Sequence, residues 1–319
     1  MPHRRRFAVA VCLLTAMGSS IAQDKTPITI GTGFASGVYF PLGNGIAGLL
    51  SKHLPGYAAK VEATGGSVDN LKLLSTNRID VGFSMADATW DAYAGIDKFK
   101  AGKLPVRALL VLYPNSLHVV TLEGGDVAKM ADLKGKQVAT GAAGSATEVM
   151  ALRLLEAIGI EKDVKRQRMS LEDSVTALKE KKIDAFFWSG GVPTAAINGI
   201  AAPGEPKFKF LDHDEAVENM NRKHGPLYAK HIIPANAYTG VGRTTKVAGV
   251  WNILVVNESM PPHVAYNIVK TIFENRGDMV AAHKEAENIS LQRQQNSFSP
   301  IPFHPGAIRY FAEKGIAVK

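Results

Sequence analysis

Glycine and hydroxyl side chains are concentrated in two turns of the sequence, residues 31–40 (GTGFASGVYF) and residues 140–149 (TGAAGSATEV). Apolar residues at helical spacing follow each turn, so each turn is expected to open a helix. Glycine lets the backbone approach a ligand, and the free N–H groups at a helix start favour negative charge. Because neither turn contains lysine or arginine, we expect backbone N–H groups and hydroxyls to bind a small anion there.

A third turn of this kind, residues 64–67 (TGGS), precedes another helical pattern. In an open α/β sheet, ligands bind beyond the carboxyl ends of the strands, where such turns lie. The candidate ligand-binding residues are therefore the glycines, hydroxyls and aromatic residues of these turns and of the neighbouring strand ends. They are Thr32, Gly33, Ser36, Gly37, Tyr39, Thr64, Gly65, Gly66 and Ser67 in the first half of the chain, and Ser116, Gly144, Ser145, Ala146, Thr147 and Trp188 in the second.

Some polar candidates have a second interpretation as helix caps. Ser36, Thr64, Ser67 and Thr147 are residue types that cap helices whether or not a ligand is bound. Asp87 is a candidate cap for the helix that follows it. If its side chain instead reaches the ligand-binding cleft that these turns would form, it would select a ligand ammonium group. The concentration of glycine and hydroxyl in matching turns favours binding for the set as a whole.

Three aromatic residues flank the same turns. Tyr39 and Trp188 would wall the cleft with an apolar face and a polar tip, and Phe34 fits the same description. The alternative is that they are core residues that happen to flank the turns.

The elements that must position these turns are duplicated. Residues 67–84 (SVDNLKLLSTNRIDVGFS) and 170–188 (SLEDSVTALKEKKIDAFFW) share a polar start, an amphipathic helix, the pair Ile-Asp and an apolar strand. Further strands alternate with helical patterns in both halves, which is typical of parallel sheets covered by helices. The pattern predicts an α/β protein of two lobes, each a mainly parallel sheet flanked by helices.

Two apolar segments are expected to cross between the lobes. The strand of residues 107–113 is interrupted by Pro114-Asn115-Ser116, which we interpret as the first crossover, and the strand of residues 249–256 is the return. Lobe 1 would then comprise residues 23–113 and 250–319, and lobe 2, residues 114–249, would be inserted into it. Two crossing segments form a hinge that can open and close.

The N-terminus has the form of a signal peptide, with three arginines, an apolar run from Phe7 to Met17 and small residues before Ala22. We expect cleavage after Ala22, so residues 1–22 would be removed. The one cysteine, Cys12, lies inside this segment, which leaves the mature chain without a disulfide or a thiolate metal site. The loss of three arginines lowers the formal net charge from +8 to +5. These features indicate export to a bacterial periplasm without membrane insertion.

Several function classes find no support in the sequence. The turn GTGFASG has serine where the dinucleotide fingerprint GxGxxG requires its last glycine, and neither a P-loop nor a GxSxG elbow occurs. The nine histidines show no metal-ligand spacing, and His304 is interpreted as a structural loop residue. The basic residues form no stripe interleaved with aromatic residues, which argues against nucleic-acid binding. We predict no catalytic residue, no metal and no cofactor.

Five segments together resemble the TAXI family of TRAP-transporter solute receptors. They are residues 28–56, 63–95, 141–160, 181–193 (KKIDAFFWSGGVP) and 301–315 (IPFHPGAIRYFAEKG). The chain departs from the family pattern at residues 34–36, 85–87 and 145–147, which line the expected cleft. The resemblance spans essentially the whole mature chain and implies a type II-like periplasmic binding protein fold.

The resemblance also implies a function. Such a receptor binds a small carboxylate or amino acid, such as a ligand of the glutamate or 2-oxoglutarate kind, and delivers it to membrane-embedded TRAP permease subunits. The alternatives are a binding protein for an ABC importer or a sensor kinase, and a periplasmic hydrolase with a spatially assembled serine, which no feature of the sequence favours.

Overall fold

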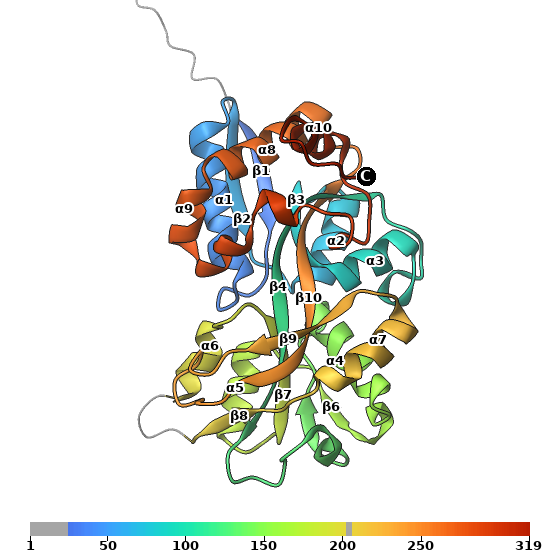
Figure 1. Cartoon of the computed structure of the whole chain (residues 1–319), viewed down its shortest axis with the longest axis vertical. Coiled ribbons are helices and arrows are strands. Elements are labelled where there is room, and N and C mark those ends of the chain that lie inside the picture. Colours follow the sequence, from blue (N-terminus) through green and yellow to red (C-terminus); the bar gives the residue numbers. More distant parts are fainter. Residues whose placement is uncertain (1–24, 202–205) are drawn as a thin grey trace, which may run out of the picture.

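Two long apolar strands connect the two halves of the molecule in a computed structural model that describes residues 25–201 and 206–319 (Figure 1). Strand β4 (Val106–Leu122) and strand β10 (Thr245–Asn257) pair in antiparallel fashion and are largely buried. β4 is continuous through Pro114, so the predicted interruption is wrong. Proline lacks an N–H group and cannot donate a hydrogen bond to the neighbouring strand. The register of β10 shifts after Trp251, the residue that faces Pro114, and this shift accommodates the missing hydrogen bond.

The first lobe contains a parallel three-stranded unit in the order β2-β1-β3, to which β10 adds in antiparallel fashion. Apolar strand residues alternate with helices whose buried faces cover the sheet. The elements are β1 (Thr26–Gly31), α1 (Tyr39–His53), β2 (Tyr57–Glu62), α2 (Ser67–Ser75), β3 (Val81–Met85), α3 (Ala86–Ala94) and η1 (Asp97–Phe99).

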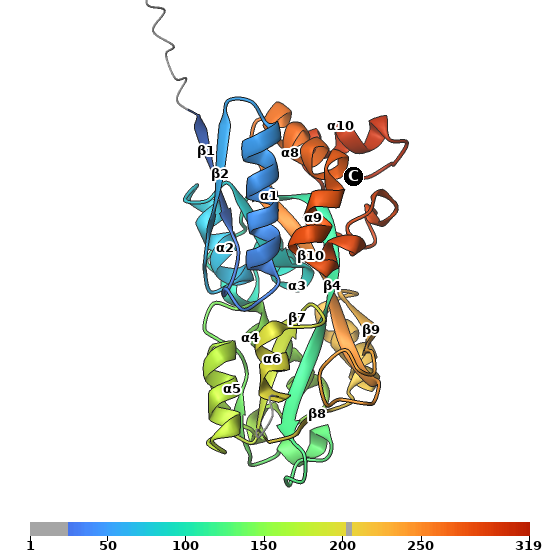
Figure 2. The ribbon, with the colours of Figure 1, turned by 90° about the vertical axis from the view of Figure 1, so that its left-hand side faces the viewer.

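The C-terminal segment returns to this lobe, where α8 and α9 lie beside α1 (Figures 1 and 2). A parallel bridge from Ala108 to Phe303 ties the end of the chain to β4. The elements are α8 (Pro262–Glu274), α9 (Arg276–Ala282), η6 (Lys284–Asn288), η7 (Leu291–Arg293) and α10 (Pro305–Glu313).

The second lobe combines parallel and antiparallel pairs. β5 pairs with β6 and β7 in parallel, whereas β7 and β8 pair with β4, and β9 with β10, in antiparallel fashion. The elements are η2 (Met130–Leu133), β5 (Gln137–Ala139), α4 (Ala146–Ala157), η3 (Glu161–Asp163), β6 (Lys165–Gln167), α5 (Leu171–Lys179), β7 (Ala185–Gly190), α6 (Ala195–Asn198), η4 (Gly199–Ala201), β8 (Phe208–Phe210), η5 (Asp214–Ala216), α7 (Val217–His224) and β9 (Tyr228–Ile233).

The two-lobed α/β fold is confirmed, and the sheet as a whole is mixed rather than mainly parallel. The crossing strands explain the difference, because each runs antiparallel to its neighbours in both lobes. Strand β9 was not expected from the sequence, since its charged and polar residues Lys230 and His231 interrupt the apolar pattern. The predicted lobe boundaries at residues 113/114 and 249/250 stay a prediction, and the signal peptide lies outside the described residues.

The duplicated unit is present as α2 with β3 and α5 with β7, but the two helices start differently. Ser170 caps α5, its Oγ accepting a hydrogen bond from Asp173 N at 3.1 Å. In α2 the N-cap position is Gly66, whose φ of +110° favours glycine. Ser67 therefore lies inside the first turn, and its hydroxyl accepts a hydrogen bond from Met85 N at 3.1 Å.

Buried apolar side chains of the crossing strands are part of a core that extends through both lobes. No helix within residues 25–201 and 206–319 is both long and apolar enough to cross a membrane.

The substitution Ile253→Ala tests the role of the crossing strands in stability. Ile253 on β10 is fully buried, so its truncation is expected to lower the free energy of unfolding by about 3 kcal/mol through lost burial and an unfilled cavity. Ile232→Ala on β9, where the side chain is 50% exposed, is the matched control and should change stability by less than about 1 kcal/mol. Urea unfolding measures both, and equal losses would contradict this account of the core.

Candidate functional site

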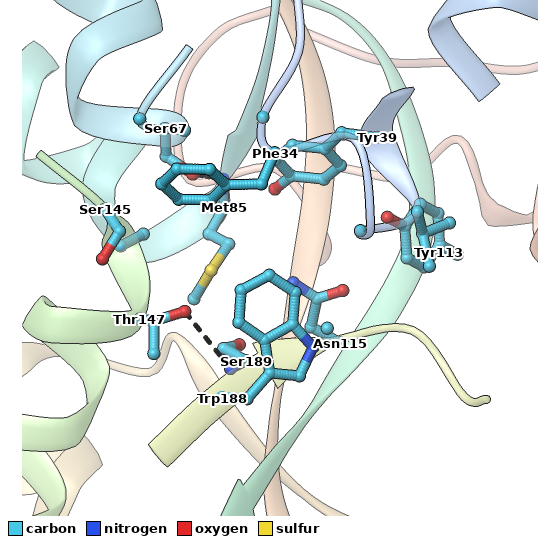
Figure 3. A pocket seen from close by; sticks show the side chains of 17 residues that line it. Phe34, Tyr39, Ser67, Met85, Tyr113, Asn115, Ser145, Thr147, Trp188 and Ser189 are labelled. Atoms are coloured by element: carbon cyan, nitrogen blue, oxygen red, sulfur yellow. Dashed lines mark hydrogen bonds between the residues drawn. The ribbon is translucent and has the colours of Figure 1, made fainter. Parts of the chain in front are cut away.

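A pocket of about 450 Å³, including its part open to solvent, lies between the lobes at the crossing strands (Figure 3). Helices α1, α2 and α4 begin at this pocket, and β4 and β7 contribute residues from its other side. No charged residue belongs to the described lining. The lining residues are Gly33, Phe34, Gly37, Val38, Tyr39, Gly65, Gly66, Ser67, Met85, Tyr113, Asn115, Ser145, Ala146, Thr147, Trp188, Ser189 and Gly190.

Ten of the sixteen predicted candidates line this pocket. All three glycine turns contribute, so the structure brings together segments that are about 30 to 110 residues apart in the sequence. The ten are Gly33, Gly37, Tyr39, Gly65, Gly66, Ser67, Ser145, Ala146, Thr147 and Trp188. The other six, Thr32, Ser36, Thr64, Asp87, Ser116 and Gly144, lie outside the lining.

Three of these six form hydrogen bonds that hold the strand ends and turns beside the pocket. The Thr32 hydroxyl donates to the Glu62 carbonyl at 2.8 Å, and the Thr64 hydroxyl lies 2.7 Å from Asn70 Oδ1. Ser116 Oγ lies 2.7 Å from His231 Nδ1. These hydroxyls fix the strand ends and turns next to the pocket.

Two more of the six lie where the lobes touch. Ser36 donates a short hydrogen bond to the carboxylate of Glu172 on α5. The carbonyl of Gly144 accepts a hydrogen bond from Asp69 N at 3.3 Å. Gly144 has a φ of +79°, which favours glycine, and a Cβ there would lie 2.4 Å from Asp69 Oδ1, so the Asp69 side chain would have to shift. The structure therefore shows the lobes in contact around the pocket.

Asp87 belongs to a fully buried polar network beside the pocket. Its carboxylate accepts hydrogen bonds from Ala88 N at 2.8 Å and from Tyr228 OH at 3.0 Å. The neighbouring Asp91 binds Arg153 of α4 through both oxygens, at 2.6 and 2.8 Å. Burial raises the pKa of Asp91 to about 6 and also raises the pKa of Asp87, although the Arg153 guanidinium opposes both shifts. This network joins the lobes, because α3 lies in the first and α4 and β9 lie in the second.

Two helix starts direct unsatisfied N–H groups at the pocket. Ser67 N at the start of α2, and Ala146 N and Thr147 N at the start of α4, have no acceptor within the described residues. Ser145 Oγ caps α4 by accepting from Glu148 N at 3.2 Å and itself donates to the Ala142 carbonyl at 2.7 Å. The turns therefore present backbone donors to the pocket, and the Asp69 carboxylate lies against Gly65 and Gly144 outside the lining.

Aromatic rings and a methionine enclose the same space. Figure 3 shows Phe34, Tyr39 and Trp188 around the Met85 side chain. Trp188 Nε1 donates to Thr194 Oγ1 at 2.9 Å, so the indole has no further N–H donor to offer a ligand. The Trp188 ring also lies 3.4 Å from the Cβ position of Gly37 in the opposite lobe.

A chain of side-chain hydrogen bonds fixes the crossing strands at the pocket. Tyr39 OH donates to Asn252 Oδ1 at 2.5 Å. Asn252 Nδ2 donates to the Tyr113 carbonyl at 2.9 Å and to Asn115 Oδ1 at 2.7 Å. Since a backbone carbonyl only accepts, these contacts set the orientation of both amides. Asn115 Nδ2 is left without an acceptor within the described residues, although the residue is only 2% exposed.

Sequence reasoning did not select Val38, Tyr113, Asn115, Ser189 or Gly190. Tyr113 immediately precedes the predicted crossover and Asn115 lies within it, and a crossover between lobes forms the floor of the cleft between them. That signal identifies the positions, but it does not reveal the partner Asn252, which lies 137 residues further along the chain.

His118 lies behind the pocket and is held as a neutral imidazole. Its Nδ1 lies 2.9 Å from the Ser116 carbonyl and 3.1 Å from that of Trp188, and Tyr238 OH donates to Nε2 at 2.8 Å. Burial lowers the pKa of His118 to about 4. The imidazole thus positions the backbone of β7 that carries Trp188.

The architecture is that of a two-lobed periplasmic binding protein, and solved structures share it. An ancestral arginine-binding protein bound to arginine has a TM-score of 0.51 and 14% identity, covering 82% of this chain and 98% of that one. The alkanesulfonate-binding protein SsuA from Xanthomonas axonopodis pv. citri, bound to MOPS, has a TM-score of 0.50 and 17% identity over 91% and 85%. Tv2483 bound to L-arginine has a TM-score of 0.50 and 13% identity over 82% and 90%.

Sequence identities of 13 to 17% establish that the fold is shared and nothing further. The family is shown by a family model that matches residues 30–315: the chain belongs to the NMT1-like family.

The substitution Arg153→Met tests the network that joins the lobes. It leaves the buried carboxylates of Asp87 and Asp91 without their cation, which costs about 3 to 5 kcal/mol if the lobes stay together. Separation of the lobes exposes these carboxylates to water and so avoids this cost. The ligand-free variant is therefore expected to be more open and to have a larger radius of gyration in small-angle X-ray scattering. Arg168→Met is the control, because Arg168 pairs with Glu148 inside the second lobe. An unchanged radius for Arg153→Met would contradict the assigned role.

The pH dependence of stability tests the state of His118. The folded-state pKa of about 4 lies below the unfolded value of about 6.5, so only the unfolded chain gains a proton as the pH falls through this interval. His118 alone is expected to lower the free energy of unfolding by about 2 kcal/mol between pH 7 and pH 4.5. Urea unfolding at several pH values should show a shallower slope for His118→Gln than for the wild type. The exposed substitution His53→Gln should keep the wild-type slope, and equal slopes for all three proteins would refute the neutral imidazole.

Proposed function

We propose that this protein is an extracytoplasmic solute-binding protein that captures a small organic anion between its lobes and delivers it to a membrane importer. One observation carries this proposal: the helix starts of α2 and α4 present unsatisfied backbone donors at one pocket between the lobes, and no charged side chain belongs to its described lining. Helix starts of this kind stabilise anions through their N–H groups and dipoles. We assign no catalytic residue, metal or cofactor to the protein.

Binding is proposed to favour closure of the lobes. Donors from both lobes reach one ligand only when the lobes are together, so the ligand stabilises the closed population. We propose lobe boundaries at residues 113/114 and 249/250 and bending where β4 and β10 exchange partners. The contacts of Ser36 with Glu172 and of Asp69 with Gly144 belong to the closed form.

The membrane partner is proposed to be an ABC importer rather than a TRAP permease. The TRAP subtype rests on the resemblance of sequence segments alone, and none of the three solved structures named above carries that name. The amino-acid and sulfonate ligands named for those structures fit the ABC alternative at least as well. The genes beside this one discriminate the two: an ATPase subunit supports the ABC importer, and a multi-span TRAP permease contradicts it.

Export through the N-terminal signal remains part of the proposal. Cleavage after Ala22 would release a chain that starts at Gln23, next to the first described strand. N-terminal sequencing of the protein recovered from a periplasmic extract tests this position.

Ligand capture is tested on the mature protein purified natively. Mass spectrometry is expected to find a co-purifying organic acid. When this acid is added to the ligand-free protein at about 100 times its dissociation constant, it should raise the free energy of unfolding by about 2.7 kcal/mol. That stabilisation corresponds to a rise of several degrees in melting temperature. Ala146→Leu, which fills the pocket, should abolish the rise, whereas Ala131→Leu at an exposed position should retain it.

The proposed function is contradicted if no organic acid co-purifies and a broad panel of carboxylates, sulfonates and amino acids leaves the melting temperature unchanged. Retention of the full thermal shift by a folded Ala146→Leu protein would place the ligand elsewhere.

A further inference from the structure

We propose that the ligand is a small organic acid with a flat apolar body and no ammonium group, and that Asn115 is the side chain that selects its anionic end. The inference rests on the proposed function and specifies the class of ligand. Three independent features of the pocket support it: the surplus of donors, the absence of a carboxylate from the described lining, and the aromatic walls.

The donor surplus is built into the crossing strands. Asn252 engages Asn115 Oδ1 at 2.7 Å, and this contact leaves Asn115 Nδ2 as the free end of the amide. Asn115 lines the pocket and is only 2% exposed as a residue, so an acceptor reaches Nδ2 from the pocket. A ligand carboxylate can supply that acceptor, because each of its oxygens accepts more than one hydrogen bond.

Hydroxyl groups of the pocket lining also favour a ligand that accepts hydrogen bonds. The hydroxyls of Ser67 and Thr147 accept hydrogen bonds from Met85 N and Ser189 N, and the Ser67 hydroxyl also contacts the Tyr39 phenol. The Thr147 proton therefore remains available to a ligand acceptor. Together with the helix-start N–H groups, it makes the pocket rich in donors. A ligand with acceptor oxygens therefore satisfies groups that the closed protein leaves unpaired.

No carboxylate belongs to the described lining of the pocket, so an ammonium group bound there has no directly adjacent counter-ion. The Asp69 carboxylate lies against the Gly65 and Gly144 turns, outside this lining. The carboxylate of Asp87 is engaged by Ala88 N and Tyr228 OH, outside the lining. Glu285 accepts from Val192 N at 2.9 Å and from Asn288 Nδ2 at 2.7 Å. Burying a cation without a paired carboxylate is strongly unfavourable, so the pocket discriminates against α-amino acids.

The walls define the body of the ligand. Phe34, Trp188 and Met85 offer apolar surface, and the indole N–H of Trp188 is already engaged by Thr194. Flat apolar groups pack well against aromatic rings, whereas a second carboxylate placed there would lose its hydration without gaining donors. An aromatic or similarly flat monocarboxylate fits the pocket better than a dicarboxylate such as a 2-oxoglutarate-like ligand.

The experiment compares matched probes by isothermal titration calorimetry and thermal shift on the stripped mature protein. 3-Phenylpropanoate and phenylalanine differ by one ammonium group, and glutarate and glutamate form the corresponding pair with a second carboxylate. We expect 3-phenylpropanoate to bind at least about tenfold more tightly than phenylalanine and than either member of the second pair. Binding of phenylalanine or glutamate at least as tight as that of its deaminated partner overturns the ligand class but leaves the proposed function standing.

The failure of the proposed function has a different signature. In that case none of the four probes binds, and no small molecule of any class co-purifies. An absence of 3-phenylpropanoate binding in a protein that co-purifies with an amino acid or a dicarboxylate also overturns this inference alone.

The role of Asn115 is tested with Asn115→Leu, which removes the donor at nearly constant volume. The affinity for 3-phenylpropanoate should fall about 10- to 100-fold, the loss of one hydrogen bond to a charged group. Asn44→Leu, the same change at an exposed position of α1, should leave the affinity unchanged. If Asn115→Leu does not fold, Asn115→Asp provides the second test, because it replaces the donor with an anion of the same shape and should abolish binding. Retained affinity in a folded Asn115 variant overturns the assignment.

Discussion

The antiparallel pairing of β4 with β10 constrains both the hinge and the floor of the cleft. These two strands are shared by the lobes, and the residues at their midpoint must satisfy polar groups in a region almost closed to water. Asn252 does so by accepting from Tyr39 and donating to Tyr113 and Asn115. The same side chain thus connects the start of α1 to both crossing strands and sets the direction of the donor that faces the ligand.

Charge is distributed so that the pocket itself stays neutral. The ionised groups that join the lobes lie beside the pocket, where Arg153 and its carboxylate partners form a buried network between α3 and α4. Such a network contributes little net stability to a folded protein but makes the relative position of its partners specific. The network therefore holds the lobes together without a ligand, and we propose that a ligand adds to this contact through uncharged donors.

The sequence predicted the parts of the site that depend on local chemistry. A glycine turn before a helix can be recognised within one segment, so Gly33, Gly65 and Ala146 were selected from the sequence, and all three line the pocket. Their part in ligand binding stays a prediction. Ser67 illustrates a limit. Capping and ligand binding were both possible for it from the sequence, but Gly66 occupies the N-cap position and the Ser67 hydroxyl holds the end of β3. Asp87 illustrates another, since its position after a strand gave no sign that Tyr228, 141 residues away, would engage it.

The parts that could not be predicted depend on contacts between distant segments. The continuity of β4 through Pro114 follows from an irregularity in β10, and the mixed character of the sheet follows from the direction in which both strands cross. Neither is encoded within a window of a few residues. Asn115 became a site residue only when its partner Asn252 was known, because the partner determines which end of the amide is free.

The central claim is that the free amide of Asn115 and the N–H groups of the helix starts bind an organic anion. It is tested most directly by NMR of protein labelled with 15N, with the Asn115 side-chain resonance assigned through its loss in Asn115→Leu. Addition of 3-phenylpropanoate should move the Asn115 Nδ2 protons and the amide protons of Ser67, Ala146 and Thr147 downfield, as expected for new hydrogen bonds to a carboxylate. Saturating ligand that leaves these four signals in place while shifting resonances elsewhere would contradict the account.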